Sequence, residues 1–161
     1  NESYLSVGGK YIIGKSDITN ENYDKLIFWA RDSVEVNIPE TIKTIGAHAF
    51  SNSKLVSITI PANANKICEH AFICCRKLSQ IEFEPNSKLQ TIEKNAFAHS
   101  KLTSIKIPAH VTQIHKEAFS YCEHLQIVEI EEDSADVSIY INVFNNYTIF
   151  MLPAQKKSNF V

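Results

Sequence analysis

The chain has 161 residues, enough for one domain of ordinary size, and its 44% apolar share can supply a hydrophobic core. Sixteen basic and 18 acidic side chains leave a formal net charge of −2, whereas a nucleic-acid-binding protein usually carries a basic surplus on one face. No apolar run reaches the roughly 18 residues of a membrane-spanning helix, and no signal-peptide pattern opens the chain. We therefore expect neither nucleic-acid binding nor membrane insertion by this segment.

Residues 1–33 are predicted to form an N-terminal cap of strands. Residues 4–7 and 10–13 read as a β-hairpin around Gly8-Gly9, because Gly-Gly suits a two-residue turn with positive φ. Residues 25–30 read as a further apolar strand, in which Phe28 and Trp29 point to opposite faces. Core packing is the expected role of this aromatic pair, and the segment as a whole should cover the first apolar face of the residues after it.

After residue 33, the pair Ala-Phe recurs at a nearly fixed interval. Its phenylalanines are Phe50, Phe72, Phe97 and Phe119, and a degenerate copy places Phe144 next to Val143. Self-similarity at a period of 20–50 residues is typical of a solenoid, in which each repeat buries its apolar face against the next. Residues 34–153 are therefore predicted to hold five to six repeats.

Each repeat also contains the pattern Leu-x-x-Ile-x-Ile or a close variant, often followed by Pro. Alternating apolar residues predict a short strand with one face inward, and Pro ends such a strand because it cannot donate to a ladder. No repeat contains an amphipathic helical pattern, so the opposite side should consist of short strand, 3₁₀ turn or loop. The expected core is lined by Phe50, Phe72, Phe97, Phe119, Phe144, Leu55, Leu78, Leu102 and Leu125.

The C-terminal residues 154–161 are predicted to be a frayed tail, and no C-terminal cap is recognisable. Cap, repeats and tail are expected to make up one structural domain. An uncovered last repeat would offer a strand edge and apolar side chains, so association of two copies through this edge is one expectation.

The repeat frame resembles the BspA-type leucine-rich repeats. Residues 38–50 (Ile-Pro-Glu-Thr-Ile-Lys-Thr-Ile-Gly-Ala-His-Ala-Phe) match this frame almost completely, and Cys75 and Cys122 fall on the family's Cys position, three residues after Phe. Ser53 and Ser100 stand there in the other two strong repeats. The resemblance covers about residues 34–130 well and 131–153 weakly.

The resemblance implies a right-handed leucine-rich-repeat solenoid, mostly β, with a parallel sheet on its concave side. It implies no catalytic residues and no cofactor. Members of the family are similar to surface proteins of bacteria and protists that bind host proteins, matrix or other cells. The frame departs from the family where no Gly follows Ile67, Ile92 and Ile114.

The candidate binding residues flank the middle apolar residue of each predicted strand, where side chains should point outward from the concave sheet. The candidate face comprises Ser57, Thr59, Gln80, Glu82, Ser104, Lys106, Ile127 and Glu129. Its two columns begin at Glu35 and Asn37 and continue to Ile149 and Met151. The C-terminal end of the face is apolar, which is typical of a protein contact but is equally compatible with cover by the tail.

Four cysteines and six histidines invite chemical hypotheses. Cys68, His70, Cys74 and Cys75 are close enough in sequence for a zinc site, but His70 and Cys75 also occupy regular slots of the repeat, which favours structural roles. We expect mostly unpaired thiols and no metal. No histidine accompanies a nucleophile elbow or a Gly-rich phosphate loop, so catalysis is not expected.

Two functions remain from sequence alone. The first is a non-enzymatic module that presents a rigid face to another protein, with an adhesive role at the cell surface or outside the cell implied by the family. The alternative is a cytoplasmic interaction scaffold or self-associating assembly subunit, favoured by unpaired cysteines and the missing signal.

Overall fold

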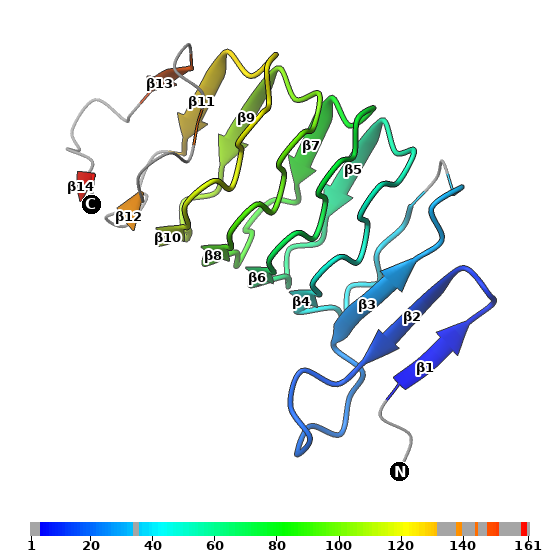
Figure 1. Ribbon diagram of the computed structural model, residues 1–161. Coiled ribbons are helices and arrows are strands. Elements are labelled where there is room, and N and C mark those ends of the chain that lie inside the picture. Colours follow the sequence, from blue (N-terminus) through cyan, green and yellow to red (C-terminus); the bar gives the residue numbers. More distant parts are fainter. Residues whose placement is uncertain are drawn as a thin grey trace.

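A computed structural model describes residues 4–33, 36–131, 138–139, 144, 148–151 and 159–160. The chain forms a β-solenoid of about five turns, and no helix occurs in this described part (Figure 1). The predicted solenoid is therefore confirmed.

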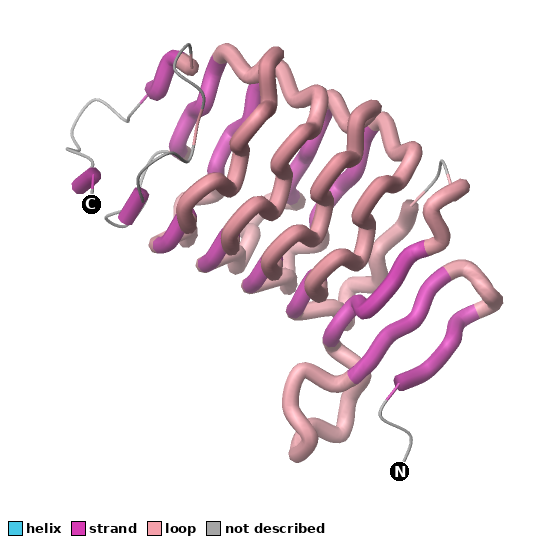
Figure 2. The backbone as a smooth tube through the Cα atoms, viewed as in Figure 1, coloured by secondary structure: helices cyan, strands magenta, loops and turns pink. Residues whose placement is uncertain are grey.

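Each coil of the solenoid runs from a short strand through a loop to a longer strand (Figure 2). The repeat Phe lies between the two strands in sequence. The short strands are β4 (Thr44–Ile45), β6 (Lys66–Ile67), β8 (Thr91–Ile92), β10 (Gln113–Ile114), β12 (Ser138–Ile139) and β14 (Asn159–Phe160). The longer strands are β5 (Ser57–Ile60), β7 (Gln80–Phe83), β9 (Ser104–Ile107), β11 (Ile127–Ile130) and β13 (Ile149–Met151). We number the coils 1 to 5 by these longer strands.

The two strand types form opposite edges of every coil. The short strands stack in parallel into one continuous sheet from β4 to β14. The longer strands form the parallel pair β5–β7 and the parallel trio β9–β11–β13. Within the described strands of this second face, β7 and β9 are the neighbours that no ladder joins.

The core is a column of stacked aromatic rings. Phe50, Phe72, Phe97 and Phe119 are fully buried, and successive ring centroids lie 4.8, 5.0 and 5.2 Å apart with interplanar angles of 12° or less. Phe144 extends the column at 5.4 Å from Phe119. Leu55, Leu78, Leu102 and Leu125 are buried beside it. Because each ring touches the rings before and after it, burial of any one coil depends on its neighbours.

Two residues in each of coils 1 to 4 adopt a left-handed backbone, one two positions before Phe and one two positions after it. These residues are His48, Asn52, His70, Cys74, Asn95, His99, Glu117 and Tyr121, with φ between 54° and 62°. Asn adopts this conformation most readily among them, because bulkier side chains crowd the neighbouring backbone. The repeat therefore imposes two tight bends around every buried ring, whatever residue stands there.

The cap forms an antiparallel three-stranded unit of β1 (Tyr4–Val7), β2 (Tyr11–Gly14) and β3 (Lys25–Trp29). Val7 pairs with Tyr11, so the turn takes three residues, Gly8, Gly9 and Lys10, where the sequence pattern predicted two. Gly8 and Gly9 have φ of 56° and 66°, as a turn with positive φ requires.

The Trp29 ring of the cap continues the aromatic column beyond Phe50. The Trp29 amide donates to the Ala49 carbonyl at 2.9 Å, just as the Phe50 amide donates to Ala71 at 2.8 Å. The Trp29 ring stacks between Tyr11 at 4.6 Å and Phe50 at 5.8 Å. Phe28, by contrast, is 37% exposed, so core packing describes only one member of the predicted pair.

The junction of cap and coil 1 explains the single Gly of the repeat frame. The Gly46 amide donates to the Leu26 carbonyl oxygen at 2.7 Å, and a Cβ at position 46 would overlap that oxygen. In later coils the equivalent positions hold Cys68 and Glu93, whose side chains are accommodated. The missing glycines are therefore compatible with a regular solenoid.

Two terminal segments differ from the sequence expectation. Residues 36–39 contain no strand, although Ile38 is buried. Asn159–Phe160 forms β14 and pairs with β12, whereas residues 154–161 were expected to fray. Residues 132–137 and 152–158 lie outside the described residues.

Candidate protein-binding face

The longer strands alternate strictly between core and solvent. In β5, Ile58 and Ile60 are buried while Ser57 and Thr59 are exposed, and β9 and β11 repeat this alternation. All eight candidate residues are exposed: Ser57, Thr59, Gln80, Glu82, Ser104, Lys106, Ile127 and Glu129. Their side chains therefore stand on one surface, which we call the strand face.

The strand register aligns these residues into columns. Thr59 lies opposite Glu82 in the β5–β7 pair, and Lys106 lies opposite Glu129 in the β9–β11 pair. The Lys106 ammonium is 3.9 Å from a Glu129 carboxylate oxygen, and the Gln80 amide donates to Glu82 at 2.9 Å. These contacts are exposed to solvent and therefore weak. The side chains can break them and bind a partner protein instead at little cost in free energy.

Apolar side chains lie at both ends of the strand face. Ile127 is 39% exposed, as its predicted outward position requires. Val56, at 56%, was not singled out by sequence reasoning, although its place directly after the motif leucine could have indicated exposure. Asn37 is exposed, Glu35 lies outside the described residues, and only the backbone of Ile149 and Met151 is described.

The repeat cysteines serve the core. Cys75 Sγ lies 3.0 Å from the Phe50 carbonyl oxygen and 3.2 Å from Ser53 Oγ, and Cys122 makes the equivalent contacts with Phe97 and Ser100. Burial raises the pKa of both thiols, which keeps them protonated and unreactive. All four cysteines are described, and no disulfide joins them in the structure.

The residues of the zinc hypothesis are not gathered into one site. Cys75 points into the core, while Cys68 lies near the Lys66–Glu93 ion pair, and burial followed by the Glu93 charge raises its pKa. In the described part of the chain, no three His, Cys, Asp or Glu side chains are placed to hold a metal ion.

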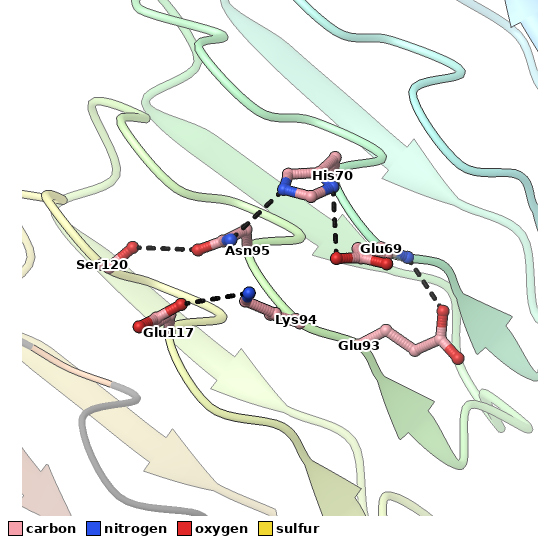
Figure 3. A network of polar contacts seen from close by, with 7 residues as sticks. All are labelled: Glu69, His70, Glu93, Lys94, Asn95, Glu117 and Ser120. Atoms are coloured by element: carbon pink, nitrogen blue, oxygen red, sulfur yellow. Dashed lines mark hydrogen bonds and ion pairs between the residues drawn. The ribbon is translucent and has the colours of Figure 1, made fainter.

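Figure 3 shows a polar network that includes His70. Asn95 Nδ2 lies 3.2 Å from His70 Nε2, and the Ser120 hydroxyl donates to Asn95 Oδ1 at 3.3 Å. Lys94 and Glu117 form a 3.8 Å ion pair alongside. Because Asn95 stands between Ser120 and His70, the imidazole does not take the serine proton in this arrangement. The network links coils 2, 3 and 4 to one another.

A known family of repeat proteins shares this frame. The model of the BspA type leucine rich repeat region matches residues 24–150 in six copies. The chain therefore belongs to the BspA-type leucine-rich repeat family, as the resemblance predicted.

Two solved structures share the fold. A leucine rich cell surface protein from Faecalibacterium prausnitzii is 31% identical, with a TM-score of 0.77 over 94% of this chain and 39% of its own. The pneumococcal vaccine antigen PcpA is 20% identical, with a TM-score of 0.70 over 86% of this chain and 40% of its own. The chain thus spans about 40% of the length of each protein.

No curated protein matches the sequence. Among the described residues, no helix has the length and apolar character needed to cross a membrane. The family and its structural neighbours support a repeat module of the protein-binding type, and such proteins are typically non-enzymatic.

Proposed function

We propose that the chain is a non-enzymatic adhesion module of a cell-surface protein and that it binds a partner protein through the strand face. The observation that carries this proposal is the regular array of exposed side chains on strands whose other side is locked into the core. A rigid array loses little conformational entropy on binding, so weak individual contacts can add up.

The composition of the strand face favours a protein ligand. Small side chains such as Ser57 and Ser104 leave the middle of the face open, while Val56 and Ile127 offer apolar contacts at its ends. Exposed apolar positions framed by polar ones are typical of protein-binding surfaces. The surface location rests on the 31% identical Faecalibacterium protein, which is named as a cell surface protein.

The test is a binding screen against extracellular-matrix and host cell-surface proteins, followed by one pair of matched variants. Ser104→Arg places a bulky cation at the centre of the strand face, and we expect it to weaken binding by about tenfold or more. Gln113→Arg also introduces an arginine, but at an exposed residue of β10 in the sheet of short strands, and it should leave affinity unchanged. Failure to bind any protein, or equal loss in both variants, would refute the proposal.

A further inference from the structure

A notch of about 260 Å³ opens beside the beginnings of β9 and β11, in the turns that come after the buried phenylalanines. It is lined by Arg76 from coil 2, by His99, Ser100 and Lys101 from coil 3, and by Tyr121, Glu123 and His124 from coil 4. These residues are spread over three coils and meet only because the coils stack.

Turn length explains why the notch exists. From Phe to the motif Leu, coil 3 takes five residues (Phe97 to Leu102), whereas coils 2 and 4 take six. The turn of coil 3 is therefore shorter than the turns on either side of it. The lining combines residues of this short turn with residues of the longer turns of coils 2 and 4.

The lining is rich in cations and hydrogen-bond donors. Arg76 and Lys101 bring two permanent positive charges against the single carboxylate of Glu123, and two imidazoles and a phenol add further polar groups. Among the described residues, neither Arg76 nor Lys101 has a carboxylate within ion-pair distance. An anion entering the notch would therefore meet two cations that form no ion pair with any described carboxylate.

Coil 1 provides an internal contrast. Lys54 occupies the position of Lys101 in the other short turn, but its ammonium is 2.8 Å from the Asp32 carboxylate. This bond to Lys54 lowers the pKa of Asp32 and so keeps it ionised. Two turns of the same length thus differ: the lysine of coil 1 is ion-paired, whereas that of coil 3 has no ion-pair partner among the described residues.

Tyr121 is an energetically unfavourable residue at its position in the turn of coil 4. It is 67% exposed, and its backbone φ of 57° is unfavourable for a bulky residue. Its ring stacks on His99 at 4.5 Å with an interplanar angle of 2°. Coil 1 places Asn52, which suits this conformation, at the same position. The bend itself is common to coils 1 to 4, so what distinguishes coil 4 is the large exposed aromatic ring that stands on it.

We propose that this notch binds one acidic sugar unit of a glycan, with Arg76 and Lys101 holding its carboxylate or sulfate and Glu123 accepting from its hydroxyls. The volume lies just under the roughly 300–1,000 Å³ of pockets for drug-sized ligands, so one unit of a longer chain fits. A polar lining with an aromatic pair suits a sugar better than a peptide, which needs an apolar recess for its anchoring side chains. The site is separate from the strand face and adds a second ligand chemistry to it.

The first experiment measures binding of the purified chain to four probes: heparin, hyaluronan, neutral dextran and polyglutamate. We expect saturable binding to heparin if sulfate is the recognised group, to hyaluronan if carboxylate is, and in either case weaker binding as salt rises. Comparable binding to dextran, equal or tighter binding to polyglutamate, or binding to none of the four would overturn the proposal.

The second experiment uses variants of the notch. Arg76→Ala and Lys101→Ala should each weaken glycan binding by about tenfold or more, since each removes a charge-assisted hydrogen bond. Lys54→Ala, the matched lysine of coil 1, should leave binding unchanged. Tyr121→Asn should weaken binding while the melting temperature stays the same or rises, because Asn relieves the left-handed backbone. Loss of binding in Lys54→Ala, or none in Arg76→Ala and Lys101→Ala, contradicts the site.

Discussion

The junctions between consecutive coils are of two kinds. Coils 1 and 2 are joined by the full β5–β7 ladder and by the contact of Cys75 with Ser53, and coils 3 and 4 are joined by the equivalent β9–β11 ladder and Ser–Cys contact. Between coils 2 and 3, no ladder joins β7 to β9. The β6–β8 ladder on the opposite side still joins these coils, and the Lys66–Glu93 ion pair and the His70–Asn95 contact link their side chains.

The β11–β13 ladder also joins coils 4 and 5, so strand pairing does not itself alternate along the solenoid. Within coils 1 to 4, however, other features repeat every two coils. Phe50 and Phe97 are 47 residues apart, as are Phe72 and Phe119. A backbone-to-carboxylate hydrogen bond also recurs at this interval. The Ala62 amide of coil 1 donates to the Glu84 carboxylate after β7, and the Ala109 amide of coil 3 donates to the Glu131 carboxylate after β11. The alternation of short and long turns that produces the notch has the same two-coil period.

The aromatic column runs through both kinds of junction, so its loss should have the largest effect. Phe97→Ala removes a ring that contacts Phe72 across one junction and Phe119 across the other. We expect a loss of about 3–5 kcal/mol in the free energy of unfolding, measured by urea denaturation. Ile18→Ala, at a 95% exposed residue of the cap, should change it by less than about 0.5 kcal/mol. Similar losses in the two variants would contradict a core column.

A double-mutant cycle separates the two kinds of junction. Ser53→Ala and Cys75→Ala should be coupled by about 0.5–1.5 kcal/mol, because the two side chains touch in the core. Cys75→Ala and Ser100→Ala, which lie across the junction of coils 2 and 3, should add without coupling. Urea denaturation of the six proteins measures both values, and equal coupling in the two cycles would remove the distinction between junctions.

The coils themselves could be predicted from sequence because spacing alone defines them. The interval between phenylalanines sets the length of each coil, and the alternation in Leu-x-x-Ile-x-Ile sets which side chains of the longer strands face the core. The role of Trp29 could not be predicted in this way, since the cap lacks the Ala-Phe pair and only the backbone bond to Ala49 places its ring in the column.

The notch could not be predicted from the sequence either. Its cause, one residue fewer between Phe97 and Leu102, is visible in the sequence. Its consequence depends on the turns of three coils lying side by side, which brings Arg76 and Lys101 to one opening. The sequence does not indicate that His99 and His124 meet, because residues more than 20 positions apart give no local pattern.

The smallest effect should come from the ion pair that links coils 2 and 3. Lys66 Nζ lies 2.7 Å from Glu93 Oε1, and the Glu69 amide donates to the same carboxylate at 2.9 Å. Burial alone would raise the pKa of Glu93, but the bonds from Lys66 and the Glu69 amide together outweigh it and lower the pKa. A lowered pKa in the folded state means that the carboxylate stabilises the fold above its ordinary value of 4.5 and that this contribution is lost as pH falls below it.

Glu93→Gln should therefore cost about 0.2–1 kcal/mol at pH 7, a small value because both side chains are partly exposed. The difference from the unmodified protein should shrink as pH is lowered from 5 to about 3, and it should also shrink in high salt. Asp32→Asn, which breaks the fully exposed pair with Lys54, provides the control and should have the smaller effect at pH 7. A Glu93→Gln difference that stays constant over this pH range would show that the ion pair does not contribute to the junction of coils 2 and 3.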